Sequence, residues 1–320
     1  MDLALLQKRA RLLRAVREFF WERGYLETDT PLLAPDLIPE ACLEVFETRR
    51  LVPRGAGGAL ESPCWLVPSP EIWMKKLIAR HRVSMFQICK CFRNGESEGA
   101  SHSPEFTMLE YYTMRADADD SLALSEALFA VLRGALDAPP GVPEPPFRIL
   151  TVDEAFVRWA GFSVLDAAEG GRLREAAAGL GLDCRASPDD ASLFDLVFVH
   201  AVEPRLRDQG LVALSAYPAF VPCLAKKGAD PRTVERWELY CNGLELANCY
   251  TEETDPRAVR AFFQSETERK RGALVPHKVD PDYWRVFEGF PPCSGVALGL
   301  DRLLMTLSGR SRIDAVLPFG

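Results

Sequence analysis

The sequence predicts an α+β fold in which helices flank an antiparallel sheet. Between Leu3 and Arg23, apolar residues recur at spacings of three and four, which is the pattern of an amphipathic helix. Residues 84–92 and 104–112 alternate between apolar and polar side chains on either side of a polar, glycine-containing loop, as two antiparallel strands do. Residues 235–250 place Asn-Gly between two further alternating stretches, which predicts a tight hairpin.

The remaining elements follow from local signals along the chain. Gly24 is placed to end the first helix, and three glycines in residues 48–64 predict a flexible loop or a hairpin connection. Five prolines make residues 137–147 a connector, and residues 151–211 predict a helix-rich segment. Four other elements are expected: a helix at 72–80, a strand at 211–218, a helix at 256–272 and a strand at 295–300 that leads into a helix.

Composition excludes several classes of protein. The 320 residues are 48% hydrophobic and 26% charged, as in soluble globular proteins. The sequence has no apolar run of about 18 residues and no signal-peptide pattern, so we expect a cytoplasmic protein without a membrane partner. Nine cysteines without repeating pairs fit a reducing compartment. Cys89 and Cys91 would share one face of a strand, which favours core packing over a zinc site.

Two arginines stand where a phosphate group could bind. Gly295 and Gly299 flank an apolar run directly before Arg302. Glycine allows close backbone approach to a ligand, and a buried arginine needs an anion to offset its desolvation. A kinked strand followed by a helix with a surface arginine would explain the same pattern. Arg93 ends the strand at 84–92 and Glu110 lies on the returning strand, so each of these charges requires a partner or a ligand.

These two arginine-containing elements resemble motifs 2 and 3 of the class II aminoacyl-tRNA synthetases, and residues 21–33 are similar to motif 1. Residues 69–77, 104–110 and 243–248 are similar to lysyl-tRNA synthetases. Stand-alone chains of this kind resemble the elongation factor P lysyltransferases. The resemblance implies a class II synthetase catalytic domain over residues 1–320, without an anticodon-binding domain. It also implies a homodimer formed through motif 1, and an insertion between motifs 2 and 3 that includes the connector, at residues 137–211.

The resemblance assigns an ATP site to residues of motifs 2 and 3. It implies that Arg93 bridges the substrate carboxylate and the α-phosphate, and that Arg302 holds the γ-phosphate, so both are catalytic. It implies that Glu238 and Glu245 bind Mg²⁺. Without the resemblance, the sequence would predict only two exposed glutamates at these positions. The other residues that match positions of ATP contact are Asn94, Glu96, His102, Ser103, Glu245, Leu246 and Gly299. His102 taken alone fits an exposed loop residue equally well.

The resemblance also assigns the amino-acid site. Glu71, Glu252 and Tyr112 match positions that hold the substrate ammonium, and carboxylates with a phenol oxygen suit a compact cation with three donors. Glu71 would otherwise be a favourable charge at the N-terminus of the helix at 72–80. The residues beside them in the same motifs are Ser69, Pro70 and Asn248.

Four positions depart from the lysyl-tRNA synthetase pattern. The acid at Glu96 is three residues after the motif 2 arginine instead of two, Ser101 replaces an arginine, and Ser103 replaces an asparagine. Ala297 stands where those enzymes commonly have glycine. Its methyl group would disfavour α-lysine and suit an amine displaced by one carbon, as in (R)-β-lysine.

The resemblance therefore implies an ATP-dependent, AMP-forming ligase that makes a lysyl-type adenylate and transfers it to a lysine side chain of elongation factor P. A truncated lysyl-tRNA synthetase and a non-catalytic regulatory relative are the alternatives. The net charge of −8 gives no basic field to attract tRNA, so we expect none as a partner. A local basic patch would still be needed for an acidic acceptor, and its candidates are Lys226, Lys227, Lys270, Arg271, Arg310 and Arg312.

Overall fold

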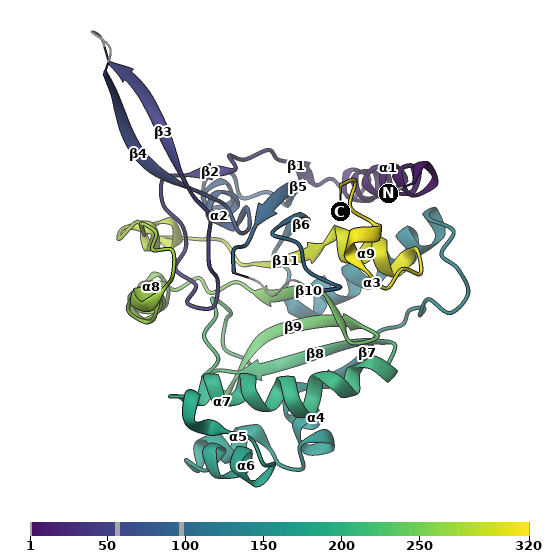
Figure 1. The fold of residues 1–320 in the computed structure, drawn as a ribbon, viewed down its shortest axis with the longest axis vertical. Coiled ribbons are helices and arrows are strands. Elements are labelled where there is room, and N and C mark those ends of the chain that lie inside the picture. The colour runs from purple at the N-terminus through teal and green to yellow at the C-terminus, as the bar shows by residue number, and fades with distance from the viewer. Residues whose placement is uncertain (1, 55–57, 96–98, 320) are drawn as a thin grey trace.

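The computed structural model describes residues 2–54, 58–95 and 99–319, and its centre is an eight-stranded sheet (Figure 1). The strands in spatial order are β1 (Leu26–Glu27), β5 (Met85–Phe92), β6 (Glu105–Met114), β11 (Cys293–Gly299), β10 (Leu244–Thr251), β9 (Thr233–Cys241), β8 (Leu211–Pro218) and β7 (Arg148–Thr151). Neighbours from β5 to β8 are antiparallel, which confirms the predicted sheet. The edges differ from the prediction because β1 runs parallel to β5 and β7 parallel to β8.

One face of the sheet is covered by three helices, α1 (Leu3–Trp21), α3 (Ala118–Ala135) and α9 (Leu300–Leu307). They bury alternate strand residues such as Leu109 and Tyr111. The amphipathic N-terminal helix is confirmed, although it ends at Trp21, two residues before the predicted boundary. Gly24 then takes a φ of 76°, a left-handed conformation that glycine adopts without steric cost.

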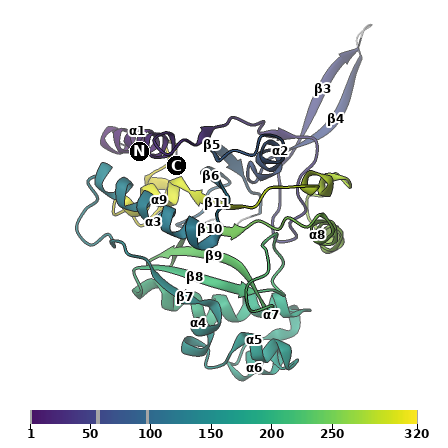
Figure 2. The ribbon, with the colours of Figure 1, turned by 180° about the vertical axis from the view of Figure 1, so that it is seen from behind.

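The second face carries the remaining helices in two groups (Figures 1 and 2). α2 (Glu71–His81) and α8 (Pro256–Arg269) pack with Met85 and Tyr112 near one end of the sheet. The helix-rich segment, with α4 (Val152–Trp159), α5 (Val164–Glu169), α6 (Leu173–Gly179) and α7 (Asp190–Val197), covers β8 at the other end. The sequence did not predict the short strand β7 before α4. No helix of the described ranges is long and apolar enough to cross a membrane.

Two further predictions concern the Asn-Gly turn between β9 and β10 and residues 48–64. The Asn-Gly turn is confirmed, because Cys241 pairs with Leu244 and the two turn residues have φ angles of 49° and 79°, as a type I′ turn requires. For residues 48–64, the structure selects the hairpin over the loop. β3 (Glu47–Arg54) and β4 (Gly58–Leu66) pair along their length, join β2 (Leu33–Ala34), and project from the body of the molecule (Figure 1).

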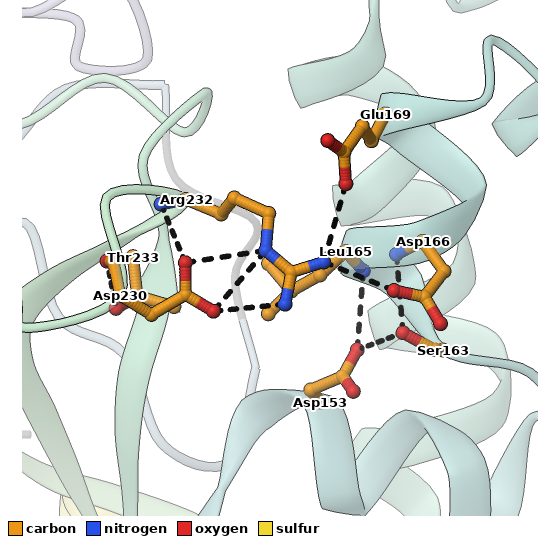
Figure 3. Close-up of polar contacts among 8 residues, drawn as sticks. All are labelled: Asp153, Ser163, Leu165, Asp166, Glu169, Asp230, Arg232 and Thr233. Atoms are coloured by element: carbon orange, nitrogen blue, oxygen red, sulfur yellow. Dashed lines mark hydrogen bonds and ion pairs between the residues drawn. The ribbon is translucent and has the colours of Figure 1, made fainter.

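An arginine links the helix-rich segment to the connection between β8 and β9. Arg232 forms a forked contact with Asp230 and reaches Asp166 at 3.0 Å and Glu169 at 3.3 Å, both on α5 (Figure 3). Each contact is solvent-exposed and contributes little alone, but the fork holds the connection in one orientation. The same connection supplies Pro222 to the cavity described next.

Candidate active site

Two connected cavities lie on the second face of the sheet. The outer cavity has a volume of about 470 Å³, and the inner pocket a volume of about 110 Å³. Eight residues line both and therefore form their junction: Glu40, Leu43, Glu71, Arg93, Met108, Asn248, Tyr250 and Ala297. Both cavities draw their walls from β6, β10 and β11, so the central strands position the site.

A buried lysine organises the acidic side chains of the inner pocket. Lys75 is fully buried on α2, and its Nζ lies 2.5 Å from Glu71 Oε1 and 2.7 Å from Glu252 Oε2. Glu71 and Lys75 are one helical turn apart, and the Tyr250 hydroxyl donates to Glu71 Oε1 at 3.2 Å. Burial alone would lower the pKa of Lys75, but the charges of Glu252 and Glu71 outweigh it and hold that pKa well above its usual value.

A third carboxylate makes the inner pocket more acidic than this lysine can balance. Glu110 accepts a hydrogen bond from the Tyr112 hydroxyl at 2.7 Å through Oε1, while its buried Oε2 has no hydrogen-bond partner in the described ranges. Burial raises the pKa of Glu110 well above its usual value. Burial also raises the pKa of Glu252 to about 7, although Lys75 opposes the rise. The raised pKa values favour the neutral forms of Glu110 and Glu252, and a bound cation would favour their ionised forms, so the pocket suits a cationic ligand.

Gly295 leaves room for these acidic side chains. A Cβ at this position would lie 2.6 Å from Glu252 Oε1 and 2.6 Å from the Tyr112 ring. Real carbon atoms do not approach so closely, so the carboxylate and the ring can pack against β11 only where the backbone has no side chain.

The outer cavity carries the two predicted arginines. Arg302, in the first turn of α9, donates to the Ser101 carbonyl at 3.2 Å and to the Glu245 carbonyl at 3.0 Å. These contacts hold its guanidinium against the wall between the motif 2 loop and β10. Arg93 lies at the junction with the inner pocket, 5.3 Å from the centre of the Phe106 ring. The site therefore has one arginine along the outer wall and another where the two cavities meet.

Glu238 and Glu245 line the outer cavity together. Glu238 accepts hydrogen bonds from Tyr217 at 2.5 Å, Tyr240 at 2.6 Å and Arg236 at 2.5 Å. Burial and the charge of Glu238 raise the pKa of Glu245. Two carboxylates in the wall of one cavity fit a divalent cation that also takes phosphate oxygens, as Mg²⁺ does. The described residues contain no cluster of three metal-binding side chains, so the protein alone would supply only part of such a coordination shell.

A buried aspartate connects α9 with α1 and β6. The carboxylate of Asp301 on α9 accepts hydrogen bonds from Arg9 Nη1 of α1 at 2.5 Å and from the Thr107 backbone N–H of β6 at 2.6 Å. Arg9 Nη2 also donates to the Thr107 hydroxyl at 2.6 Å. Because Arg302 follows Asp301 directly, this contact fixes the start of the helix that carries the outer arginine.

Most of the predicted site residues lie in the cavity walls. The inner pocket includes Ser69, Glu71, Tyr112, Asn248, Glu252 and Ala297, and the outer cavity includes Arg93, His102, Ser103, Glu238, Glu245, Leu246, Gly299 and Arg302. Among the described residues, Pro70 and Asn94 lie in neither wall. The Pro70 carbonyl accepts from Trp73 at the start of α2, and the Asn94 amide donates to the Val45 carbonyl at 3.3 Å. Glu96 lies outside the described residues.

Several polar residues of the site were not predicted as members of it, among them Glu40, Lys75, Arg236 and Tyr250; Glu110 was predicted only to require a partner or a ligand. For Lys75 a signal existed, because it follows Glu71 by four residues on a predicted helix. The proposed surface role of Lys270 is wrong. Its buried ammonium donates to the backbone carbonyls of Glu40 and Leu43, so it anchors a loop instead of forming a basic patch.

Comparison with known proteins identifies the family of this chain. The family model of class II tRNA synthetases (D, K and N) matches residues 3–320. The chain belongs to this family. The match leaves no room within these 320 residues for a separate anticodon-binding domain, as the sequence predicted.

Two curated relatives are similar to the chain over nearly its whole length. A protein of Avibacterium paragallinarum is 36% identical over 317 residues, which cover 98% of this chain and 94% of that protein. A protein of Vibrio cholerae serotype O1 is 36% identical over 323 residues, which cover 99% and 95%. Both relatives are named elongation factor P–(R)-β-lysine ligase.

Proposed function

We propose that this protein uses ATP to activate (R)-β-lysine as an adenylate and then transfers the acyl group to a lysine side chain of elongation factor P. The observation that carries the proposal is an acidic inner pocket that opens, at Arg93, into a larger cavity containing Arg302. A cationic tail fits the first space and a triphosphate fits the second. The names of the two relatives, similar over nearly their full lengths, support this substrate and this acceptor.

The two arginines and the two carboxylates of the outer cavity would have different roles in the activation step. The substrate carboxylate attacks the α-phosphorus and pyrophosphate leaves, so negative charge develops at the junction of the two cavities. Arg93 would stabilise that charge there, and Arg302 would hold the departing phosphates, so that catalysis is positioning and electrostatics. Mg²⁺ would be held by Glu238 and Glu245 and would neutralise phosphate oxygens. Loop contacts to ATP from Asn94, Glu96, His102 and Ser103 stay predictions.

The transfer step needs no covalent enzyme intermediate. The acceptor amine attacks the adenylate carbonyl, an amide bond forms, and AMP leaves. The inner pocket meanwhile keeps the substrate in place, because Glu110, Glu252 and Tyr112 hold its terminal ammonium. Ala297 at the junction would favour the β-isomer over α-lysine.

We also infer a cytoplasmic homodimer formed through motif 1. Large apolar side chains are exposed along that region, including Trp21 at 53%, Leu26 at 53% and Leu33 at 51%. A row of such residues is typical of a surface that a partner subunit covers. The negative net charge supports a protein acceptor over tRNA. Residues 137–211 are proposed as an insertion that packs on the end of the sheet.

The test offers purified protein ATP with either lysine isomer and measures pyrophosphate exchange, then adds labelled amino acid with elongation factor P or tRNA. We expect exchange with (R)-β-lysine above that with α-lysine, and label on elongation factor P. Arg302→Ala should reduce exchange by about 100-fold or more, as expected for loss of a phosphate-binding cation. Label on tRNA would instead support a truncated synthetase, and no exchange with either isomer would support a non-catalytic relative.

A further inference from the structure

The division of the cavities predicts where each end of a diamino acid lies. Glu110, Tyr112 and Glu252 line only the inner pocket, so the amine far from the carboxylate belongs there. The reacting carboxylate must reach the phosphate, so it belongs at the junction beside Arg93. The second amine of a lysine isomer is only one or two carbons from that carboxylate. It therefore also lies at the junction.

Two carboxylates face the junction, and they differ in their contacts. Glu71 is already bound by Lys75 at 2.5 Å and by the Tyr250 hydroxyl at 3.2 Å. The Glu40 carboxylate has no ion pair or hydrogen bond in the described part of the chain. A carboxylate without a direct ion pair or hydrogen bond in a partly buried cavity is costly unless a cation joins it.

Glu40 is held at this place by its main chain. The Lys270 ammonium donates to the Glu40 carbonyl at 2.9 Å, and the Ala41 N–H donates to Glu266 Oε2 at 2.9 Å. Glu44 on the same segment accepts the backbone N–H groups of residues 274 and 275 through its carboxylate. The segment is thus fixed against α8 and the chain that follows it. Glu40 itself lines both cavities.

We propose that Glu40 binds the substrate amine nearest the reacting carboxylate, and so forms with Glu71 a second amine subsite at the junction. The proposal rests on the proposed function and extends it to a residue that no motif contains. Burial and the charge of Glu71 raise the pKa of Glu40, although Arg93, Lys270 and Lys75 oppose the rise. A bound ammonium would favour the ionised form of this carboxylate.

The test compares a ligand that has the second amine with one that lacks it. For wild type and Glu40→Gln we would measure kcat/KM for (R)-β-lysine in pyrophosphate exchange, and the inhibition constant of 6-aminohexanoate. We expect Glu40→Gln to lower kcat/KM for β-lysine by about 10- to 100-fold, as for the loss of a charge-assisted contact. The inhibition constant of 6-aminohexanoate and the KM for ATP should stay within about twofold.

Two further variants separate recognition from loop damage. Glu44→Gln weakens the anchor of the same segment, so it should affect β-lysine and 6-aminohexanoate by similar factors. Glu40→Asp keeps the charge and should retain part of the discrimination between the two ligands. Equal effects of Glu40→Gln on both ligands would overturn the subsite while leaving the proposed function intact. Failure of the wild type to activate any lysine isomer would overturn the proposed function, and the subsite with it.

Discussion

Replacing Gly295 with alanine tests the inner pocket most directly. The added Cβ would lie 2.6 Å from Glu252 Oε1 and from the Tyr112 ring, whereas ordinary contacts begin at 3.4 Å. Each neighbour must therefore retreat by about 0.8 Å, and overpacking of this kind costs about 1–3 kcal/mol. In the free protein the two side chains can move into the inner pocket of about 110 Å³. When an amino acid fills that pocket, this movement is blocked.

The cost should consequently appear in substrate binding more than in folding. About 2 kcal/mol corresponds to a KM for the amino acid that is about 30-fold higher. Pyrophosphate exchange would measure KM for the amino acid and for ATP separately, and the KM for ATP should change little because the outer cavity is untouched. Gly134→Ala on α3 is the matched control, since a Cβ there meets nothing within 4 Å. An unchanged amino-acid KM in folded Gly295→Ala would refute the placement of the substrate tail.

Three other predictions concern buried charges. Lys75→Met should lower the free energy of unfolding by about 3–5 kcal/mol in urea denaturation, because Glu71 and Glu252 lose their shared cation. Arg9→Met should raise the KM for ATP more than that for the amino acid, because Asp301 no longer fixes the start of α9; equal changes would contradict this. The free energy of unfolding should fall as pH rises from about 5 to 8, because the pKa of Glu252 in the folded protein, about 7, exceeds its value in the unfolded chain. The fall should reach up to about 3 kcal/mol in the wild type and should be smaller in Glu252→Gln.

Sequence patterns located the site residues that lie in or directly beside a regular strand or helix. Arg93 directly follows β5 and Arg302 lies in the first turn of α9, so period-two and helical patterns located both correctly. The parallel edge strand β7 was missed because its four residues follow a proline-rich connector and give too short a pattern. Pairing direction at a sheet edge depends on tertiary contacts that alternation does not encode.

The charge balance of the inner pocket could not be predicted from the same patterns. Glu71 and Glu252 were assigned to the substrate, and in the structure both carboxylates also contact the ammonium of the fully buried Lys75. How much of a carboxylate's charge remains for a ligand depends on such internal partners, which become visible only when distant segments meet. Glu40 gave no signal because it lies on an irregular loop. Asn94 was assigned to ATP by the family resemblance, and in the structure its amide donates to the Val45 carbonyl; its contact with ATP stays a prediction.

Side chains alternate along β6 between the two faces of the sheet, so neighbouring residues serve either the apolar core or the inner pocket. Leu109 and Tyr111 belong to the apolar interior beneath α1 and α3, whereas Met108, Glu110 and Tyr112 line the inner pocket. Changes at the first pair would reduce the amount of folded protein in a cell. Changes at the other three would also alter the inner pocket, so a deep mutational scan across this strand would show the larger loss of activity per folded molecule at every second position.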